Sequence, residues 1–141
     1  MDFFLIEPEV AGDLGDGTVM DTSVHPPRVS SLHYVIQDWF GDDIIASFPC
    51  YLVTPRLAKA LEAANLTGFH FDAARVTLSA EAADFGITEV PEFRWLVITG
   101  RPGNEDFGVV ANGQAVISEE ALQVLRAHTV DECEIEPYTS E

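Results

Sequence analysis

Basic residues are scarce in this sequence. Its 141 residues include 7 lysines and arginines against 24 aspartates and glutamates, which gives a formal net charge of −17 at pH 7. Nucleic acids and anionic membranes are bound through Lys and Arg, so we expect neither partner. A surface of this charge instead attracts a basic partner over long range. The alternative is that the acidity only keeps the protein soluble, or reflects a salt-adapted or acid-biased proteome.

Cysteines and long apolar runs are also few. Cys50 and Cys133 have neither metal-ligand spacing nor the pattern of a disulfide framework. No apolar run approaches the roughly 18–20 residues that a membrane span needs. Met1-Asp2 carries no basic segment and the apolar stretch at 3–6 is short, so we expect no signal peptide and a cytoplasmic location.

The overall composition is that of a folded protein. Hydrophobic residues make up 47% of the chain and charged residues 22%, which favours a globular structure over disorder. The length fits a single domain over residues 1–141, and no internal boundary is visible. Residues 11–31 contain three glycines, two prolines and scattered polar residues, so we predict an irregular segment there.

The strongest pattern is a unit that occurs twice at a constant offset of 64 residues, in about residues 50–76 and 114–138. In each copy an apolar strand ends at a hydroxyl residue, Thr54 or Ser118, that can cap a following helix. Apolar residues then recur at the spacing of a buried helical stripe, and a turn leads into a second strand that ends in an acidic residue. The match predicts a duplicated strand–helix–strand unit; the alternative is convergence of two common units.

Short apolar stretches between turn residues predict further strands. Residues 93–99 form one of them, and Asn112-Gly113 favours a tight hairpin turn between 107–111 and 115–117. Many short strands with only two substantial helices predict a single-domain α+β fold, with helices on one side of a largely antiparallel sheet.

The sequence contains no motif for metal, cofactor or catalysis. The aspartates of residues 12–17 lack EF-hand spacing, and residues 100–103 lack the lysine of a phosphate-binding loop. The four histidines are scattered, and Cys50 has no nearby base in the sequence. We therefore expect no catalytic residues, metal or cofactor. Paired carboxylates for acid–base chemistry stay open, because many acidic residues are present and nothing singles out a pair.

One irregular stretch combines large aromatics with acidic residues and is the candidate partner-binding site. It consists of Asp38, Trp39, Phe40, Gly41, Asp42 and Asp43. Exposed aromatics ringed by charge are typical of binding hot spots. The alternative is that Trp39 and Phe40 pack inward while the aspartates only hold the turn. Glu105 and Asp106, in the turn that follows Arg101, are weaker candidates of the same kind.

Several segments resemble a known bacterial family. Residues 41–45, 48–54, 61–69, 93–97 and 133–136 are similar to the eleventh type of immunity protein encoded beside polymorphic toxins, of which many members are uncharacterised. The similarity covers about residues 38–136, and its motifs are mostly caps, helices, turns and strands. It implies non-covalent neutralisation of a toxin and supplies no catalytic residues.

These observations favour a non-enzymatic, immunity-type protein that binds and neutralises a cognate toxin, a basic protein such as a nuclease, through its acidic surface. One alternative is a general acidic binding or adaptor module, whose charge serves only solubility. A third hypothesis is a small hydrolase or transferase that uses clustered carboxylates, which requires a deep pocket with two carboxylates of raised pKa.

Overall fold

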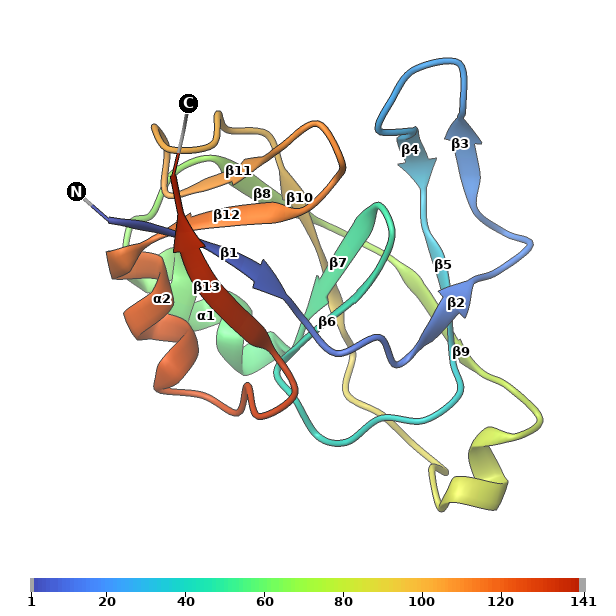
Figure 1. The fold of residues 1–141 in the computed structure, drawn as a ribbon. Coiled ribbons are helices and arrows are strands. Elements are labelled where there is room, and N and C mark those ends of the chain that lie inside the picture. The colour runs from blue at the N-terminus through green and yellow to red at the C-terminus, as the bar shows by residue number, and fades with distance from the viewer. Residues whose placement is uncertain (1, 140–141) are drawn as a thin grey trace.

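The predicted α+β class is confirmed. The computed structural model describes residues 2–139, and within them short strands predominate over two α-helices and one 3₁₀ helix (Figure 1). The strands are β1 (Phe3–Glu7), β2 (Gly12–Leu14), β3 (Val19–Asp21), β4 (Arg28–Ser31), β5 (His33–Ile36), β6 (Ile44–Ser47), β7 (Cys50–Val53), β8 (Phe69–Asp72), β9 (Arg75–Leu78), β10 (Arg94–Ile98), β11 (Phe107–Val109), β12 (Ala115–Ser118) and β13 (Glu134–Tyr138). The helices are α1 (Pro55–Ala63), η1 (the 3₁₀ helix, Ala82–Phe85) and α2 (Glu119–Arg126).

Two four-stranded sheets share one topology. Their strand orders are β6-β7-β10-β8 and β11-β12-β1-β13, and every neighbouring pair in both is antiparallel. In each sheet a hairpin leads into a helix, the strand after the helix forms the far edge, and a further strand fills the centre. The repeat seen in the sequence is therefore present in the fold, with Thr54 and Ser118 at equivalent positions.

The central strands are exchanged between the two halves. Strand β1 precedes the unit β6-β7-α1-β8 in the chain but lies in the sheet of the second unit, while β10 precedes β11-β12-α2-β13 but lies in the sheet of the first. Neither half has a complete sheet without a strand from the other. The two halves therefore form one cooperative structure.

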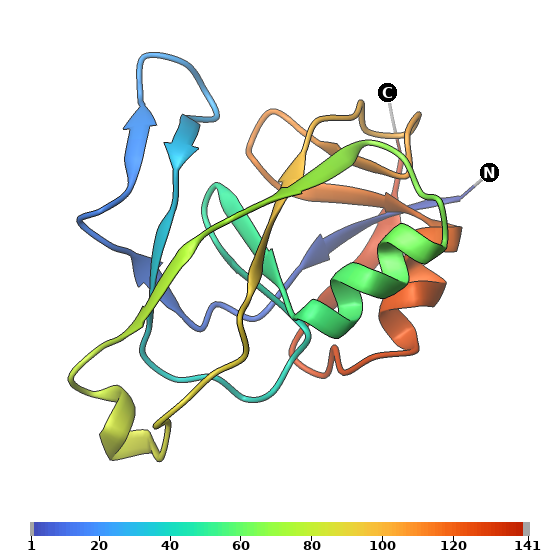
Figure 2. The same cartoon turned by 180° about the vertical axis from the view of Figure 1, so that it is seen from behind.

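Both helices lie side by side on the same side of the molecule, as the two opposite views show (Figures 1 and 2). Their buried stripes are Leu57, Ala58 and Leu61 in α1 and Ala121, Leu122 and Leu125 in α2. These residues pack with inward-facing residues of both sheets in one hydrophobic cluster. The predicted caps are present, since the Thr54 hydroxyl accepts from Leu57 N and the Ser118 hydroxyl from Ala121 N.

Asp43 connects the two halves. One carboxylate oxygen accepts a hydrogen bond from the Thr54 hydroxyl (2.5 Å), so the carboxylate supports the cap of α1. The other accepts from the backbone N–H of Thr129 (2.8 Å), which follows α2. The backbone N–H of Asp43 also donates to the Thr129 carbonyl (2.7 Å). The Asp43 side chain thus joins the start of α1, in its own half, to the segment that follows α2 in the other half.

Asp106 makes the same connection in reverse. Its carboxylate accepts from the Ser118 hydroxyl (2.6 Å) at the cap of α2, and from the backbone N–H of Thr67 (2.9 Å), which follows α1. The N–H of Phe107, the next residue, donates to the Thr67 carbonyl (3.1 Å). We call Asp43 and Asp106 the reciprocal tethers.

The segment 11–31, predicted to be irregular, is instead ordered into β2, β3 and β4, so that prediction is wrong. Strand β2 pairs with β5, which also pairs in parallel with β9. Gly12 makes this possible, because a Cβ there would lie 1.8 Å from the Val35 carbonyl oxygen. Strands β3 and β4 pair only with each other and form a hairpin, the arm, that stands beside the β6–β7 hairpin (Figures 1 and 2).

We predict that replacing either tether destabilises the fold. Asp43→Ala leaves the Thr129 N–H and the Thr54 hydroxyl without their acceptor in a buried place, which should lower the free energy of unfolding by about 3 kcal/mol. Asp106→Ala should cost about 1–2 kcal/mol, because that tether is more exposed. Urea unfolding measures both, with the exposed Asp72→Ala as control. An Asp43→Ala variant as stable as the control would contradict the tether.

Candidate functional site

The loop 38–43 holds its two aromatic side chains in opposite ways. Trp39 packs inward: its ring meets Phe93 edge-to-face at 5.5 Å, and its indole N–H donates to the Asp42 carbonyl (2.9 Å). Phe40, the next residue, is 67% exposed. The loop therefore anchors one aromatic ring and presents the other to solvent.

Asp42 and Asp43 are buried, at 0% and 1% exposure, and do not form an acidic binding surface. The prediction that they contact a partner is contradicted by their burial. Asp42 accepts hydrogen bonds from the backbone N–H groups of Asp131 (3.1 Å) and Glu132 (2.8 Å). Arg56 binds Asp43 through two N–H groups, each at 2.7 Å. Both aspartates hold the turn, as the alternative interpretation stated.

The two neighbouring carboxylates have opposite pKa shifts. Burial raises the pKa of Asp42 above its usual range, although two backbone N–H groups act against the rise and the charges of Asp131 and Asp43 add to it. Burial acts on Asp43 in the same direction, but hydrogen bonds from Arg56, Thr54 and Thr129 outweigh it and lower its pKa.

Glu9 also supports the loop, a role that the sequence analysis did not predict. It is 6% exposed, and one carboxylate oxygen accepts from the backbone N–H of Phe40 (2.8 Å), while the other has no hydrogen-bond partner within the described chain. Burial raises its pKa, the Phe40 N–H partly offsets this, and the charge of Asp42 adds to the rise. A glutamate just after Pro8 at a strand end is ordinarily a solvated residue, so no local pattern distinguishes it.

Glu105 and Asp106 do not join this loop. Asp106 is the second tether, and Glu105 accepts from Asn104 Nδ2 (2.7 Å) and the backbone N–H of Arg101 (3.3 Å) within its own turn. Asp106 is bonded to Thr67 and Ser118, and no hydrogen bond of either residue reaches 38–43. Both weaker candidates make structural hydrogen bonds, and contact of either with a partner stays a prediction.

The exposed surface around Phe40 combines apolar and acidic residues. Val10 is 69% exposed, and the residues on either side of it contact the loop: Glu9 binds Phe40 N, and the Ala11 carbonyl accepts from Asp38 N. The backbone of Asp131 and Glu132 is held by Asp42, which leaves their side chains exposed beside the loop. We call Val10, Asp38, Phe40, Asp131 and Glu132 the Phe40 patch.

A cavity of about 370 Å³ lies next to this patch, between Trp39, Arg56 and Pro91. Its one cation, Arg56, is already bound to Asp43, whose pKa is lowered. Glu9 and Asp42, the carboxylates with raised pKa, do not line it. The pocket with two such carboxylates that the hydrolase hypothesis requires is therefore not found here.

The two cysteines and the possible metal ligands also show no arrangement for chemistry within the described residues. Burial raises the pKa of the Cys50 and Cys133 thiols to about 12, so both are protonated at neutral pH. Among residues 2–139, no three His, Cys, Asp or Glu side chains are grouped to hold a metal ion. In the same residues, no helix has the length and apolar character to cross a bilayer.

Comparison with known proteins assigns the chain to no family. No protein-family model matches the sequence, and no curated protein matches it. The resemblance to immunity proteins stays a prediction.

We predict that Glu9→Gln stabilises the protein at neutral pH. The folded pKa of Glu9 lies above its usual value near 4.5, so its favourable contribution is complete below that pH and is lost as the pH rises through the folded pKa. Glutamine keeps an acceptor for Phe40 N and removes the buried charge. Urea unfolding should show the variant more stable than the parent at pH 7 and nearly equal at pH 3.5. The surface change Glu81→Gln serves as control; a Glu9→Gln variant less stable at pH 7 would contradict this account.

Proposed function

We propose that this protein is a non-enzymatic, immunity-type binding module that neutralises a basic bacterial toxin, with the Phe40 patch as its contact surface. The observation that supports this most is an exposed aromatic ring on a loop fixed by buried carboxylates and bordered by exposed acidic residues. The resemblance of residues 38–136 to toxin immunity proteins supplies the class of partner.

The loop is preorganised for binding. The Glu9 carboxylate fixes the backbone of Phe40, the Trp39 indole is bonded to the Asp42 carbonyl, and Asp42 itself is bonded to the 131–132 turn. A ring presented on a fixed backbone loses little conformational entropy when it is buried by a partner. Phenylalanine also contributes a large apolar area in one residue. These are the properties of a binding anchor.

The charge around the anchor favours a basic partner. Asp38, Asp131 and Glu132 belong to the patch, and the chain as a whole carries a formal charge of −17. Charges at the edge of an interface mainly accelerate association and make it sensitive to salt. A toxin with a basic active-site surface, such as a nuclease, has the complementary positive electrostatic potential. An adaptor whose acidity serves only solubility would bind with little dependence on salt.

The test is binding of the toxin encoded beside this gene, measured by calorimetry and by rescue of cells that express the toxin. We predict that Phe40→Ala weakens binding by about 30-fold, because an apolar anchor is lost. The double change Asp131→Lys and Glu132→Lys should slow association and reduce its salt dependence. Neither variant should change thermal stability much, because all three side chains are exposed.

Matched control variants distinguish the role of the Phe40 patch from the effects of losing any exposed phenylalanine or of changing the net charge. Phe85→Ala removes another phenylalanine, 59% exposed, on η1. Glu81→Lys with Glu89→Lys makes the same change in net charge elsewhere. Both controls should bind like the parent. If the neighbouring protein is neither toxic nor bound, the proposed function fails; if it binds and Phe40→Ala binds equally well, the patch is wrong and the function stands.

A further inference from the structure

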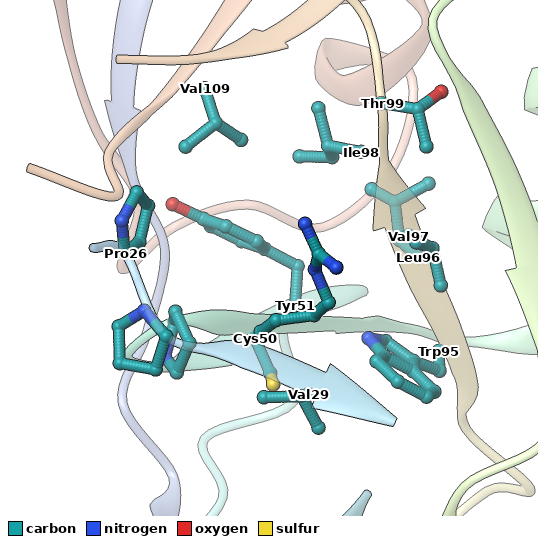
Figure 3. A pocket seen from close by; sticks show the side chains of 13 residues that line it. Pro26, Val29, Cys50, Tyr51, Trp95, Leu96, Val97, Ile98, Thr99 and Val109 are labelled. Carbon is teal, nitrogen blue, oxygen red and sulfur yellow. The ribbon is translucent and has the colours of Figure 1, made fainter. Parts of the chain in front are cut away.

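A second cavity, of about 370 Å³, lies between the arm and the sheet that contains β10. Figure 3 shows Val29 of β4, Cys50 of β7, Trp95 and Ile98 of β10 and Val109 of β11 around it. Its volume is that of a site for a small molecule, and most of its wall is apolar. It shares no residue with the Phe40 patch.

Contacts between three hairpin ends fix the walls of this cavity. The Phe48 ring lies 6.3 Å from the His25 ring at the end of the arm. It also packs against Gly113 in the turn before β12, where an added Cβ would meet it at 2.3 Å. The Tyr51 hydroxyl donates to the carbonyl of the same Gly113 (2.9 Å). The cavity is therefore built into the fold.

The cavity includes a piece of strand edge that the sheet does not use. The pairing of β10 with β7 ends at Leu96 opposite Tyr51, and continuing the register would place Ile98 opposite Pro49. Proline has no N–H to donate to the Ile98 carbonyl, so the ladder stops there. Within residues 2–139, the Ile98 N–H also has no carbonyl partner outside the strand pairings. Thr99 N donates to Gly68 O on the β8 side, and since bonding directions alternate along an antiparallel strand, the N–H and C=O of Ile98 point to the β7 side. Both Ile98 and Pro49 line the cavity.

Arg28 supplies the one charge at this cavity. The only ion pair within residues 2–139 is that of Arg56 with Asp43, so Arg28 forms none there. Its neighbour across the arm, Asp21, directs its carboxylate to the N–H and hydroxyl of Ser23. These hydrogen bonds lower the pKa of Asp21, and the charge of Arg28 adds to the lowering without a direct ion pair. A guanidinium group binds a carboxylate with two parallel hydrogen bonds. An exposed guanidinium without an ion pair, beside an apolar cavity and the Ile98 N–H, matches a ligand with an apolar body and a carboxylate.

We propose that the cavity beneath the arm is a binding site for a small apolar carboxylate. The apolar body lies against Val29, Trp95 and Val109, and the carboxylate binds Arg28, with the Ile98 N–H as a second donor. Two sources share this chemistry: a free short-chain or aromatic acid, and the carboxyl terminus of a peptide that ends in an apolar residue. The site is independent of the proposed function.

The test compares three probes of equal length, hexanoate, 1-hexanol and hexylamine, on the full chain by NMR titration of backbone amides and indole N–H groups. Hexanoate should shift the Ile98 amide and the Trp95 indole, with a dissociation constant of about 1 mM for a ligand of this size. The neutral and cationic probes should bind at least about tenfold more weakly. The net charge of −17 alone would give the reverse order of affinity, because it attracts hexylammonium and repels hexanoate.

Variants identify the cation. Arg28→Met keeps an unbranched apolar stem without the guanidinium and should weaken hexanoate binding about tenfold. Arg75→Met removes the guanidinium of an exposed arginine on β9 and should leave hexanoate binding unchanged. Equal binding by all three probes, equal binding by Arg28→Met, or no shift of Ile98 with hexanoate would each overturn the proposal.

A further pair of probes distinguishes the two sources. A tetrapeptide that ends in leucine is titrated with a free and with an amidated carboxyl terminus. Binding of the free form tighter than hexanoate, with loss on amidation, supports the site and assigns it to a peptide terminus. Hexanoate binding without peptide binding supports the site and assigns it to a free acid. Equal binding of both peptide forms contradicts a carboxylate site.

Discussion

The Asp43 carboxylate is the interaction on which most of this structure depends. It lies where the cap of α1, the segment after α2 and the loop that carries Phe40 meet, and it is bonded to the first two. Asp106 repeats the arrangement with the roles of the two halves exchanged. Because β1 and β10 are also exchanged between the sheets, the halves are joined both by strands and by tethers. A buried carboxylate is costly unless its oxygens are hydrogen-bonded, and here each oxygen of Asp43 is.

The same buried groups that stabilise the fold also shape its surface. Asp42 fixes the 131–132 turn, and Glu9 fixes the backbone of Phe40, so the acidic side chains of the turn and the exposed ring keep a set arrangement. The acidic residues therefore have two separate roles. The buried acidic residues organise the loop, and the exposed acidic residues provide a negative electrostatic potential that would attract a basic partner. The exposed acidic residues can be replaced without damage to the fold, whereas the buried Asp43 cannot.

Local patterns predicted the helices, their caps and the α+β class, because helix periodicity and capping depend on residues only a few positions apart. They did not predict the exchange of β1 and β10, which depends on pairing between strands far apart in sequence. They also placed Asp42 and Asp43 at the surface, since aspartates in a glycine-containing turn are usually solvated. What buries them is contact with Thr129, Asp131 and Glu132, nearly ninety positions later. The order of segment 11–31 was missed for a similar reason, as Gly12 serves close strand approach rather than a turn.

Native-state hydrogen exchange of the Thr129 and Thr67 amides tests the central claim most directly. Each N–H lies in a connecting segment outside the strands and helices and donates to a tether carboxylate. If the tethers join the two halves, both amides exchange only through global unfolding, with the same free energy as the core strands. Exchange of either amide at the rate of an exposed loop amide such as that of Thr22 would contradict the account.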